Sequence, residues 1–180
     1  MNNDGFEHII DGFPLAYLIT FTCYGTRLHG DPDGSIDRLH NTYDTPRLTG
    51  NPSRVRANLA RMSEVPYRLD QMSRRVVLEA IQSACSEKEW NLIAAHVRTT
   101  HNHTVVGAAC EPNVIRGTFK SNATRQLNLA GCDPGRKHRW TPKGSVRYLW
   151  TRNHVAAAVE YVILGQGEPM ERYEKPGWNF

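Results

Sequence analysis

The segment 15–23 (LAYLITFTC) constrains the fold more than any other, because apolar, aromatic and β-branched residues fill it. A short run of this kind is typical of a strand buried on both faces. Such a strand needs neighbouring strands and covering helices, so we expect it inside a sheet. A chain of 180 residues can supply that cover in one domain. We predict a single domain over residues 1–180, with a core at about 15–167 and a polar tail at 168–180 that is loosely held.

The remaining elements follow from hydrophobic period and turn residues. A long polar stretch runs from Gly25 to about Tyr67, and its segment 30–34 (GDPDG) is a turn by composition. Helices are expected at 73–89, at 112–129 and from an N-cap at Asn153 to near Gly165. Strands are expected at 91–98, 103–108 and 145–150, with a turn at 99–102.

This order predicts the fold class. Without the insertion and the last helix, it is that of a split βαβ, ferredoxin-like sandwich. We therefore expect an α+β fold with an antiparallel sheet, a long insertion after the first strand and a C-terminal helix. The same architecture hosts many functions, so function must come from particular residues.

Composition excludes several classes of protein. The four cysteines show neither CxxC pairs nor a compact framework, which argues against a zinc finger or a disulfide scaffold. No apolar run approaches the roughly 18 residues of a membrane span. Asp4 and Glu7 precede any apolar stretch, unlike the basic start of a secretory signal. These features favour a reduced, cytoplasmic setting without a membrane partner.

Basic residues gather in the second half of the chain. Between Pro112 and Arg152 stand nine Lys or Arg and one acidic residue, Asp133. Trp140, Tyr148 and Trp150 lie among them, and flat rings beside cations suit stacking on unpaired bases. A solvated surface, with Tyr148 and Trp150 buried on one strand face, is the alternative. The predicted DNA-contacting residues are Arg116, Lys120, Arg125, Arg136, Lys137, Arg139, Trp140, Lys143 and Arg147.

The sequence His101-Asn102-His103 precedes a β-prone run. Alternate residues of a strand share a face, so both imidazoles would project together and could share one divalent cation. Two histidines with an oxygen ligand suit Mn²⁺ and, less ideally, Mg²⁺. Polar residues at a solvent-facing strand start are the alternative.

The last helix adds a tyrosine. Tyr161 lies beside the apolar stripe on a face of small residues, so its hydroxyl could reach a substrate; a half-buried tyrosine at the rim is the alternative. Gln166 follows closely and could bring an amide oxygen to a metal. The stripe consists of Val155, Val159, Val162 and Ile163.

Four segments resemble a known family: YLITFTCYGTRLHGD (17–31), HVRTTHNHTVVGA (96–108), RYLW (147–150) and AVEYVILGQG (158–167). In this order they are similar to the HUH single-tyrosine transposases of the insertion-sequence 200/605 type, and more closely to the REP-associated tyrosine transposase-like proteins. The resemblance spans most of residues 15–167.

The resemblance implies metal-dependent cleavage and rejoining of single-stranded DNA beside hairpins, in DNA transposition or a domesticated relative. Tyr161 would be the nucleophile that forms a 5′-phosphotyrosine, and His101, His103 and Gln166 would hold Mg²⁺ or Mn²⁺. The partner would be single-stranded or hairpin DNA, bound by a monomer or homodimer associated with the nucleoid.

The sequence departs from the family pattern at two positions. Asn102 stands where a bulky hydrophobic residue is expected, and Gln166 follows Tyr161 by five residues rather than four. Gly165 could end the helix and bring Gln166 back. Glu160, His154 and His29 are other candidates for the third ligand, and both His29 and Asp31 could lie over the site. A hairpin-binding module without catalysis and a metal-dependent hydrolase that uses water remain alternative functions.

Overall fold

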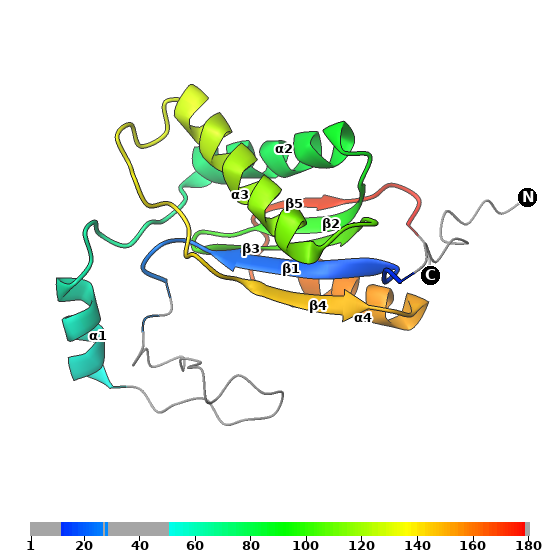
Figure 1. The fold of residues 1–180 in the computed structure, drawn as a ribbon, viewed down its shortest axis with the longest axis horizontal. Coiled ribbons are helices and arrows are strands. Elements are labelled where there is room, and N and C mark those ends of the chain that lie inside the picture. The colour runs from blue at the N-terminus through cyan, green and yellow to red at the C-terminus, as the bar shows by residue number, and fades with distance from the viewer. Residues whose placement is uncertain (1–11, 27, 29–50, 179–180) are drawn as a thin grey trace, which may run out of the picture.

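The computed structural model describes residues 12–26, 28 and 51–178 (Figure 1). It confirms the predicted α+β class. In chain order the elements are β1 (Ala16–Thr22), α1 (Pro52–Ala60), α2 (Gln71–Glu87), β2 (Asn91–Val97), β3 (His101–Gly107), α3 (Pro112–Leu129), β4 (Ser145–Leu149), α4 (Arg152–Ile163) and β5 (Glu171–Glu174).

Within these residues the strands form one sheet in the order β4-β1-β3-β2-β5. Each neighbouring pair is antiparallel. The first four strands have the arrangement of a ferredoxin-like sandwich, and the apolar strand β1 lies inside the sheet, as predicted. Its residues Ala16, Ile19 and Phe21 are fully buried.

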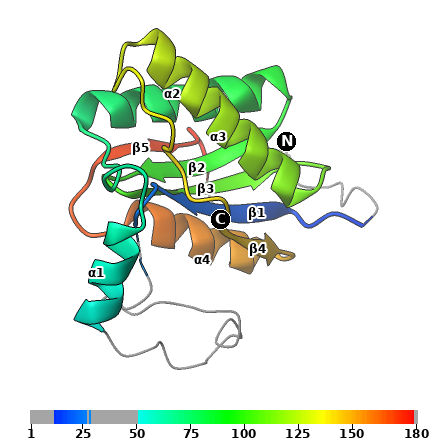
Figure 2. The same ribbon diagram turned by 60° about the vertical axis from the view of Figure 1, so that its left-hand side comes forward.

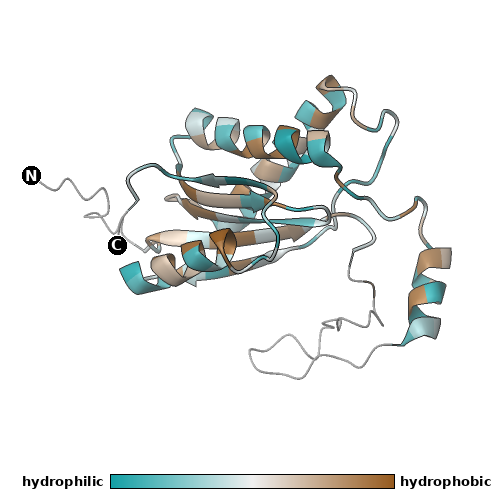
Figure 3. Ribbon diagram, turned by 180° about the vertical axis from the view of Figure 1, so that it is seen from behind, coloured by the Kyte–Doolittle hydropathy of each residue, from teal (hydrophilic) through white to brown (hydrophobic). Residues whose placement is uncertain are grey.

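Helices cover the sheet on both faces. Helices α2 and α3 lie on one face and α4 lies on the other (Figure 2). Because side chains of a strand alternate between faces, β1 sends Ile19 and Phe21 into the core beneath α2 and α3, and Ala16 into the smaller core beneath α4. Viewed from behind, the apolar positions concentrate on the strands between the two helical layers (Figure 3).

Several predicted boundaries needed correction. The last helix begins at Arg152, because Thr151 rather than Asn153 is its N-cap and accepts the backbone N–H of His154. It ends at Ile163, and the residue with left-handed backbone geometry is Gly167, at φ 74°, rather than Gly165. Strand β3 begins two residues earlier than predicted, since pairing with β1 extends to His101.

The expectation of a loosely held tail is wrong for Glu171–Glu174. These residues form β5, which pairs with the outer edge of β2. An ion pair between Glu171 and Arg74 of α2 fastens its first residue, and the backbone N–H of Lys175 donates to the carbonyl of Ile93. Backbone pairing therefore makes a strand from residues whose composition is mostly charged.

The described part of the insertion contains α1, which starts at the N-cap Asn51, buries no residue and stands apart from the sheet (Figure 1). The predicted turn at 30–34, His29 and Asp31 lie outside the described residues. All four cysteines are thiols. None of the helices in the described part of the chain combines the length and apolar character needed to cross a membrane.

Candidate active site

The two histidines lie together on the sheet face that α4 covers. His101 and His103 alternate with buried Asn102 on β3, and Val105, the next residue on the histidine face, packs beneath α4. The centroids of the two imidazole rings are 5.0 Å apart. The structure thus brings the predicted ligand pair together at the start of β3.

A threonine hydroxyl contacts the Nδ1 atom of each ring. Thr20 Oγ1 lies 2.6 Å from Nδ1 of His103, its cross-strand partner, and Thr100 Oγ1 lies 3.1 Å from Nδ1 of His101. A hydrogen bond at one ring nitrogen fixes the orientation of an imidazole. With Nδ1 used in this way, Nε2 is the atom through which each ring would bind a cation.

Tyr161 reaches the histidines from α4. Its ring centroid is 5.3 Å from that of His103, with the planes at 71°, and the side chain is 46% exposed. The neighbouring face of α4 buries Val155, Val159 and Val162 against the sheet. Packing of this apolar stripe therefore places a solvent-accessible phenol beside the histidine pair.

The turn after α4 passes close to the tyrosine because Gly165 has no side chain. A Cβ atom there would lie 2.8 Å from the Tyr161 carbonyl oxygen and 3.2 Å from its Cδ2 atom. Contacts this short are rarely tolerated, so any larger residue would move the turn or the tyrosine. Gly165 thus acts through close packing rather than through left-handed geometry.

His96 is a residue of this region that the sequence analysis missed. It is fully buried on β2, beside His103 of β3. Its Nδ1 atom lies 3.0 Å from the carbonyl oxygen of Val162, and its Nε2 atom accepts the backbone N–H of Met170 at 3.1 Å. Burial lowers its pKa, which favours the neutral ring that these two contacts require. His96 joins the end of α4 and the start of β5 to the sheet.

The described candidates for the third metal ligand are Gln166, Glu160 and His154. Gln166 lies in the turn after α4, where its Nε2 atom donates to the carbonyl of Tyr161 at 3.2 Å. Its side chain therefore returns to the tyrosine, although five residues separate the two. Glu160 and His154 are exposed on α4. Among the described residues, no group of three His, Cys, Asp or Glu side chains could hold a metal.

Two imidazoles and an amide oxygen are of the donor types that bind a divalent cation. Asn102 leaves this face clear, because it is buried on the opposite face and its Nδ2 atom donates to Thr104 Oγ1. The polar residue in the middle of the histidine sequence is thus only half satisfied, since its Oδ1 atom is buried without a hydrogen-bond partner in the residues that the structure describes.

The predicted DNA-contacting residues of α3 lie on the opposite face of the sheet. Arg116 donates to the carbonyl of Gly144, and Arg125 donates to Asn122. Lys120 donates to the carbonyls of three successive residues, 141–143. Burial, with Arg116 nearby, lowers the pKa of Lys120 to about 8. Arg116 and Lys120 therefore hold the chain that leads into β4.

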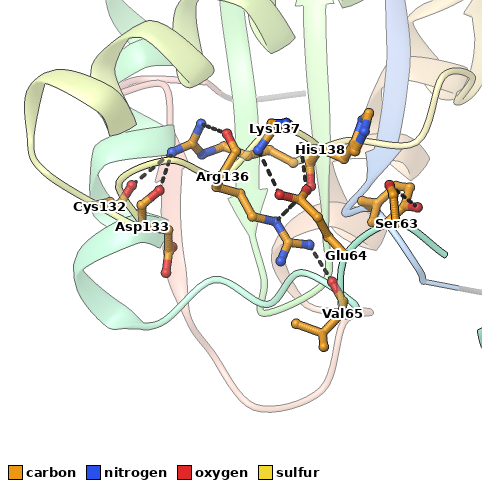
Figure 4. Close-up of polar contacts among 10 residues, drawn as sticks. Ser63, Glu64, Val65, Cys132, Asp133, Arg136, Lys137 and His138 are labelled. Atoms are coloured by element: carbon orange, nitrogen blue, oxygen red, sulfur yellow. Dashed lines mark hydrogen bonds and ion pairs between the residues drawn. The ribbon is translucent and has the colours of Figure 1, made fainter.

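The basic loop at 131–144 is held by the insertion (Figure 4). The Glu64 carboxylate accepts the backbone N–H groups of Lys137 and His138, at 3.0 and 2.8 Å, and these bonds lower its pKa. Arg136 lies 3.5 Å from the same carboxylate and donates to the carbonyl of Val65. These contacts fix the conformation of the loop, and Lys137 remains exposed to solvent.

Two other predicted residues of this loop point inward. Arg139 is 3% exposed and donates to the carbonyls of Cys132, Asp133 and Arg136. Trp140 packs edge-on against Phe21. These contacts give both residues structural roles that the sequence analysis did not predict.

Lys143 and Arg147 are exposed. Arg147 is the cross-strand partner of Leu18, so it projects from β4 on the histidine face. Of the nine predicted DNA-contacting residues, Arg147 is the one that strand alternation places on the same face as His103 and Tyr161.

Comparison with known proteins gives a distant likeness to solved structures. No protein-family model matches the chain, and no curated protein matches its sequence. Among solved structures, the chain is similar to a REP-associated tyrosine transposase bound to a REP hairpin, with a TM-score of 0.48 and 10% sequence identity. The match covers 83% of this chain and 65% of that one, so the chain spans about two thirds of the length of its structural neighbour.

Proposed function

We propose that this protein cleaves and rejoins single-stranded DNA at hairpin-flanked sites through a covalent bond to Tyr161, with a divalent cation at His101 and His103. One observation carries the proposal: two sheet histidines and a helical tyrosine, distant in sequence, converge on one face with ring centroids 5.0 and 5.3 Å apart. The sequence resemblance described above gives the same three residues the same roles.

Tyr161 would act as the nucleophile. Its Oη atom attacks the scissile phosphorus, the bond to the 3′ oxygen breaks, and the phenolic proton is transferred so that a free 3′-hydroxyl leaves. The product is a 5′-phosphotyrosine, which conserves the energy of the phosphodiester bond. Attack by a 3′-hydroxyl on this linkage reverses the reaction and rejoins DNA without ATP.

A phenol needs help in this reaction, because its ordinary pKa is about 10. The Nε2 atoms of His101 and His103, with the amide oxygen of Gln166, would hold Mg²⁺ or Mn²⁺. When bound, such a cation neutralises phosphate charge and orients the group for in-line attack.

The surrounding residues position these groups. Thr20 and Thr100 orient the imidazoles, His96 fixes the end of α4, and Gly165 allows the turn to pass beside Tyr161. Arg147, exposed on the same face, would bind a neighbouring phosphate of the strand.

The test is a denaturing gel of the protein with labelled hairpin DNA and Mn²⁺. We expect a slowly migrating covalent species that requires the metal and disappears in Tyr161→Phe. Tyr173→Phe is the matched control, because it removes a partly exposed phenol of β5 from the opposite face of the sheet, away from the proposed DNA-binding residues. Its covalent yield should equal that of the wild type.

Other outcomes identify the alternative functions. DNA that binds under native conditions but is neither captured nor cut would mean a hairpin-binding protein without catalysis. Cleavage that survives Tyr161→Phe would mean that water is the nucleophile, and the role given to Tyr161 would be wrong.

A further inference from the structure

Two half-exposed aromatic rings stand together at the end of β4, on the sheet face opposite the histidines. Tyr148 is 45% exposed and Trp150 is 51% exposed. Their ring centroids are 6.2 Å apart, and their planes differ by only 11°. Two nearly parallel flat surfaces of this size are thus open to solvent.

A buried ring supports this pair. Tyr148 is the cross-strand partner of Tyr17, and its ring meets the Tyr17 ring edge-on at 5.3 Å. Tyr17 is 1% exposed, and its hydroxyl donates to the carbonyl of Cys110 at 3.1 Å. Tyr148 therefore rests on a buried residue of the core, and Trp150 stacks on Tyr148.

The surrounding sequence is strongly cationic. No acidic residue occurs between Asp133 and Glu160. The exposed cations nearest to the two rings in the sequence are Lys143, Arg147 and Arg152. Arg136 and Arg139 are instead engaged in the basic loop. Exposed rings combined with cations are the two components of a surface for single-stranded nucleic acid, because rings stack on bases and cations neutralise phosphates.

We propose that Tyr148 and Trp150 stack unpaired bases of the same DNA strand whose backbone is processed at Tyr161; the inference rests on the proposed handling of single-stranded DNA. A second copy of the chain pairing along the edge of β4 is less favoured. Two-fold symmetry would place this cationic segment beside the same segment of the second copy, where the like charges repel.

The two faces define a path around the edge of the sheet. Arg147 projects toward the histidine face, and Tyr148 and Trp150 lie toward the other. Ser145 of β4 is paired with Thr20 of β1, which is paired with His103 of β3. Trp150 lies five residues after Ser145 in the chain. At about 3.3 Å per residue and about 4.8 Å per strand, the separation is roughly 20 Å. At roughly 3.4 Å per stacked nucleotide, the strand needs on the order of six nucleotides to connect the two places.

The experiment measures binding of labelled hairpins with single-stranded extensions of increasing length. Fluorescence anisotropy in EDTA separates binding from cleavage. Wild-type affinity should rise once the extension reaches about six nucleotides. Trp150→Ala should weaken binding of the long substrate roughly five- to 150-fold, while Trp150→Phe retains most of it. An abasic nucleotide at the stacked position should weaken wild-type binding but leave Trp150→Ala unaffected.

Leu129→Ala is the matched control, because Leu129 is a 73% exposed apolar residue at the end of α3. It should bind DNA as the wild type does. Long-substrate affinity that is unchanged in both Trp150→Ala and Tyr148→Ala would overturn the proposal. Loss of a dimer in Trp150→Ala at unchanged DNA affinity would overturn it too, and would assign the surface to a second copy. If the wild type binds no single-stranded DNA, both this proposal and the proposed function are wrong. If it binds through Trp150 but is not captured covalently, only the proposed function is wrong.

Discussion

At the residue scale, the Thr20 hydroxyl orients the imidazole ring of His103. Thr20→Val removes the hydroxyl 2.6 Å from Nδ1 of His103 and keeps nearly the same shape. Loss of a hydrogen bond behind a metal ligand typically costs about 10- to 100-fold in metal affinity or activity. We expect a decrease of that order in Mn²⁺ affinity, measured by calorimetric titration.

Thr22→Val is the control for Thr20. Thr22 is two residues further along the same strand face, but its hydroxyl bonds Thr141 rather than a histidine ring. Equal losses in the two variants would show that the Thr20 hydroxyl has no particular role in orienting His103.

Asp70 provides a pH-dependent contribution to stability. Its carboxylate accepts the Ser73 backbone N–H at the start of α2, at 2.7 Å, and this bond lowers its pKa from the ordinary 3.8. Because the folded pKa is the lower one, the stabilisation is complete above the unfolded value and is lost as the pH falls through the folded value. Asp70→Ala should cost about 1 kcal/mol near neutral pH, and urea unfolding should show the difference shrinking in acid.

Asp70→Asn is the control, because it keeps a capping oxygen that does not titrate. Its stability relative to Asp70→Ala should depend much less on pH. The same acid dependence in both comparisons would contradict this account of the cap.

Individual residues differ in how far the sequence predicts them. Strand alternation alone predicts that His101 and His103 share a face, and they do. The inward positions of Arg139 and Trp140 were not predictable, because composition counts a cation without showing which backbone carbonyls surround it. His96 carries no pattern of its own, and its role exists only through contacts with Val162 and Met170.

At the element scale, His96 connects α4 and β5 to the sheet. His96→Leu keeps a buried side chain but leaves the Val162 carbonyl and the Met170 N–H without this partner. Each buried group left unpaired costs about 1–3 kcal/mol, so we expect a lower free energy of unfolding in urea. Amide exchange should also become faster across residues 164–174, around the junction of the two elements.

The control for His96 is His154→Leu, which changes an exposed histidine in the first turn of α4. It should leave amide exchange at 164–174 unchanged. Normal exchange in His96→Leu would mean that packing of Val162 alone fixes the end of the helix.

Elements with a clear period were predicted well, and β5 was not. The predicted helix at 112–129 agrees with α3 at both ends. Strand β5 has the sequence ERYE, whose charged residues do not predict a strand. Pairing with β2 supplies its stability. Its position depends on a partner strand about 75 residues earlier in the chain.

At the scale of the whole molecule, Glu64 joins the insertion to the basic loop. Glu64→Ala removes the acceptor of two backbone N–H groups and the neighbour of Arg136. We expect faster amide exchange at Lys137 and His138, measured by mass spectrometry on peptides from 131–144. Glu79→Ala is the control, since Glu79 is exposed on α2. Unchanged exchange in Glu64→Ala would mean that the loop holds its own conformation.

The convergence of the site could not be derived from patterns alone. Periodicity gives α4 a buried stripe, but it does not say which face of the sheet the stripe covers. Only in the folded chain does α4 lie opposite α2 and α3, where Tyr161 meets His103. The sequence resemblance implied a common site for these residues, and packing supplies the physical reason.

The late position of β5 in the sequence has a consequence during synthesis. A ribosome releases both site histidines and Tyr161 before it releases Met170 and β5, so the emerging chain lacks the second contact of His96 and the Arg74–Glu171 ion pair. The edge of β2 also stays open until that moment. Since domains generally fold as units while they emerge, the final residues of the sheet complete the support behind the tyrosine helix. The order of translation therefore delays a rigid site until Met170 and β5 have left the ribosome.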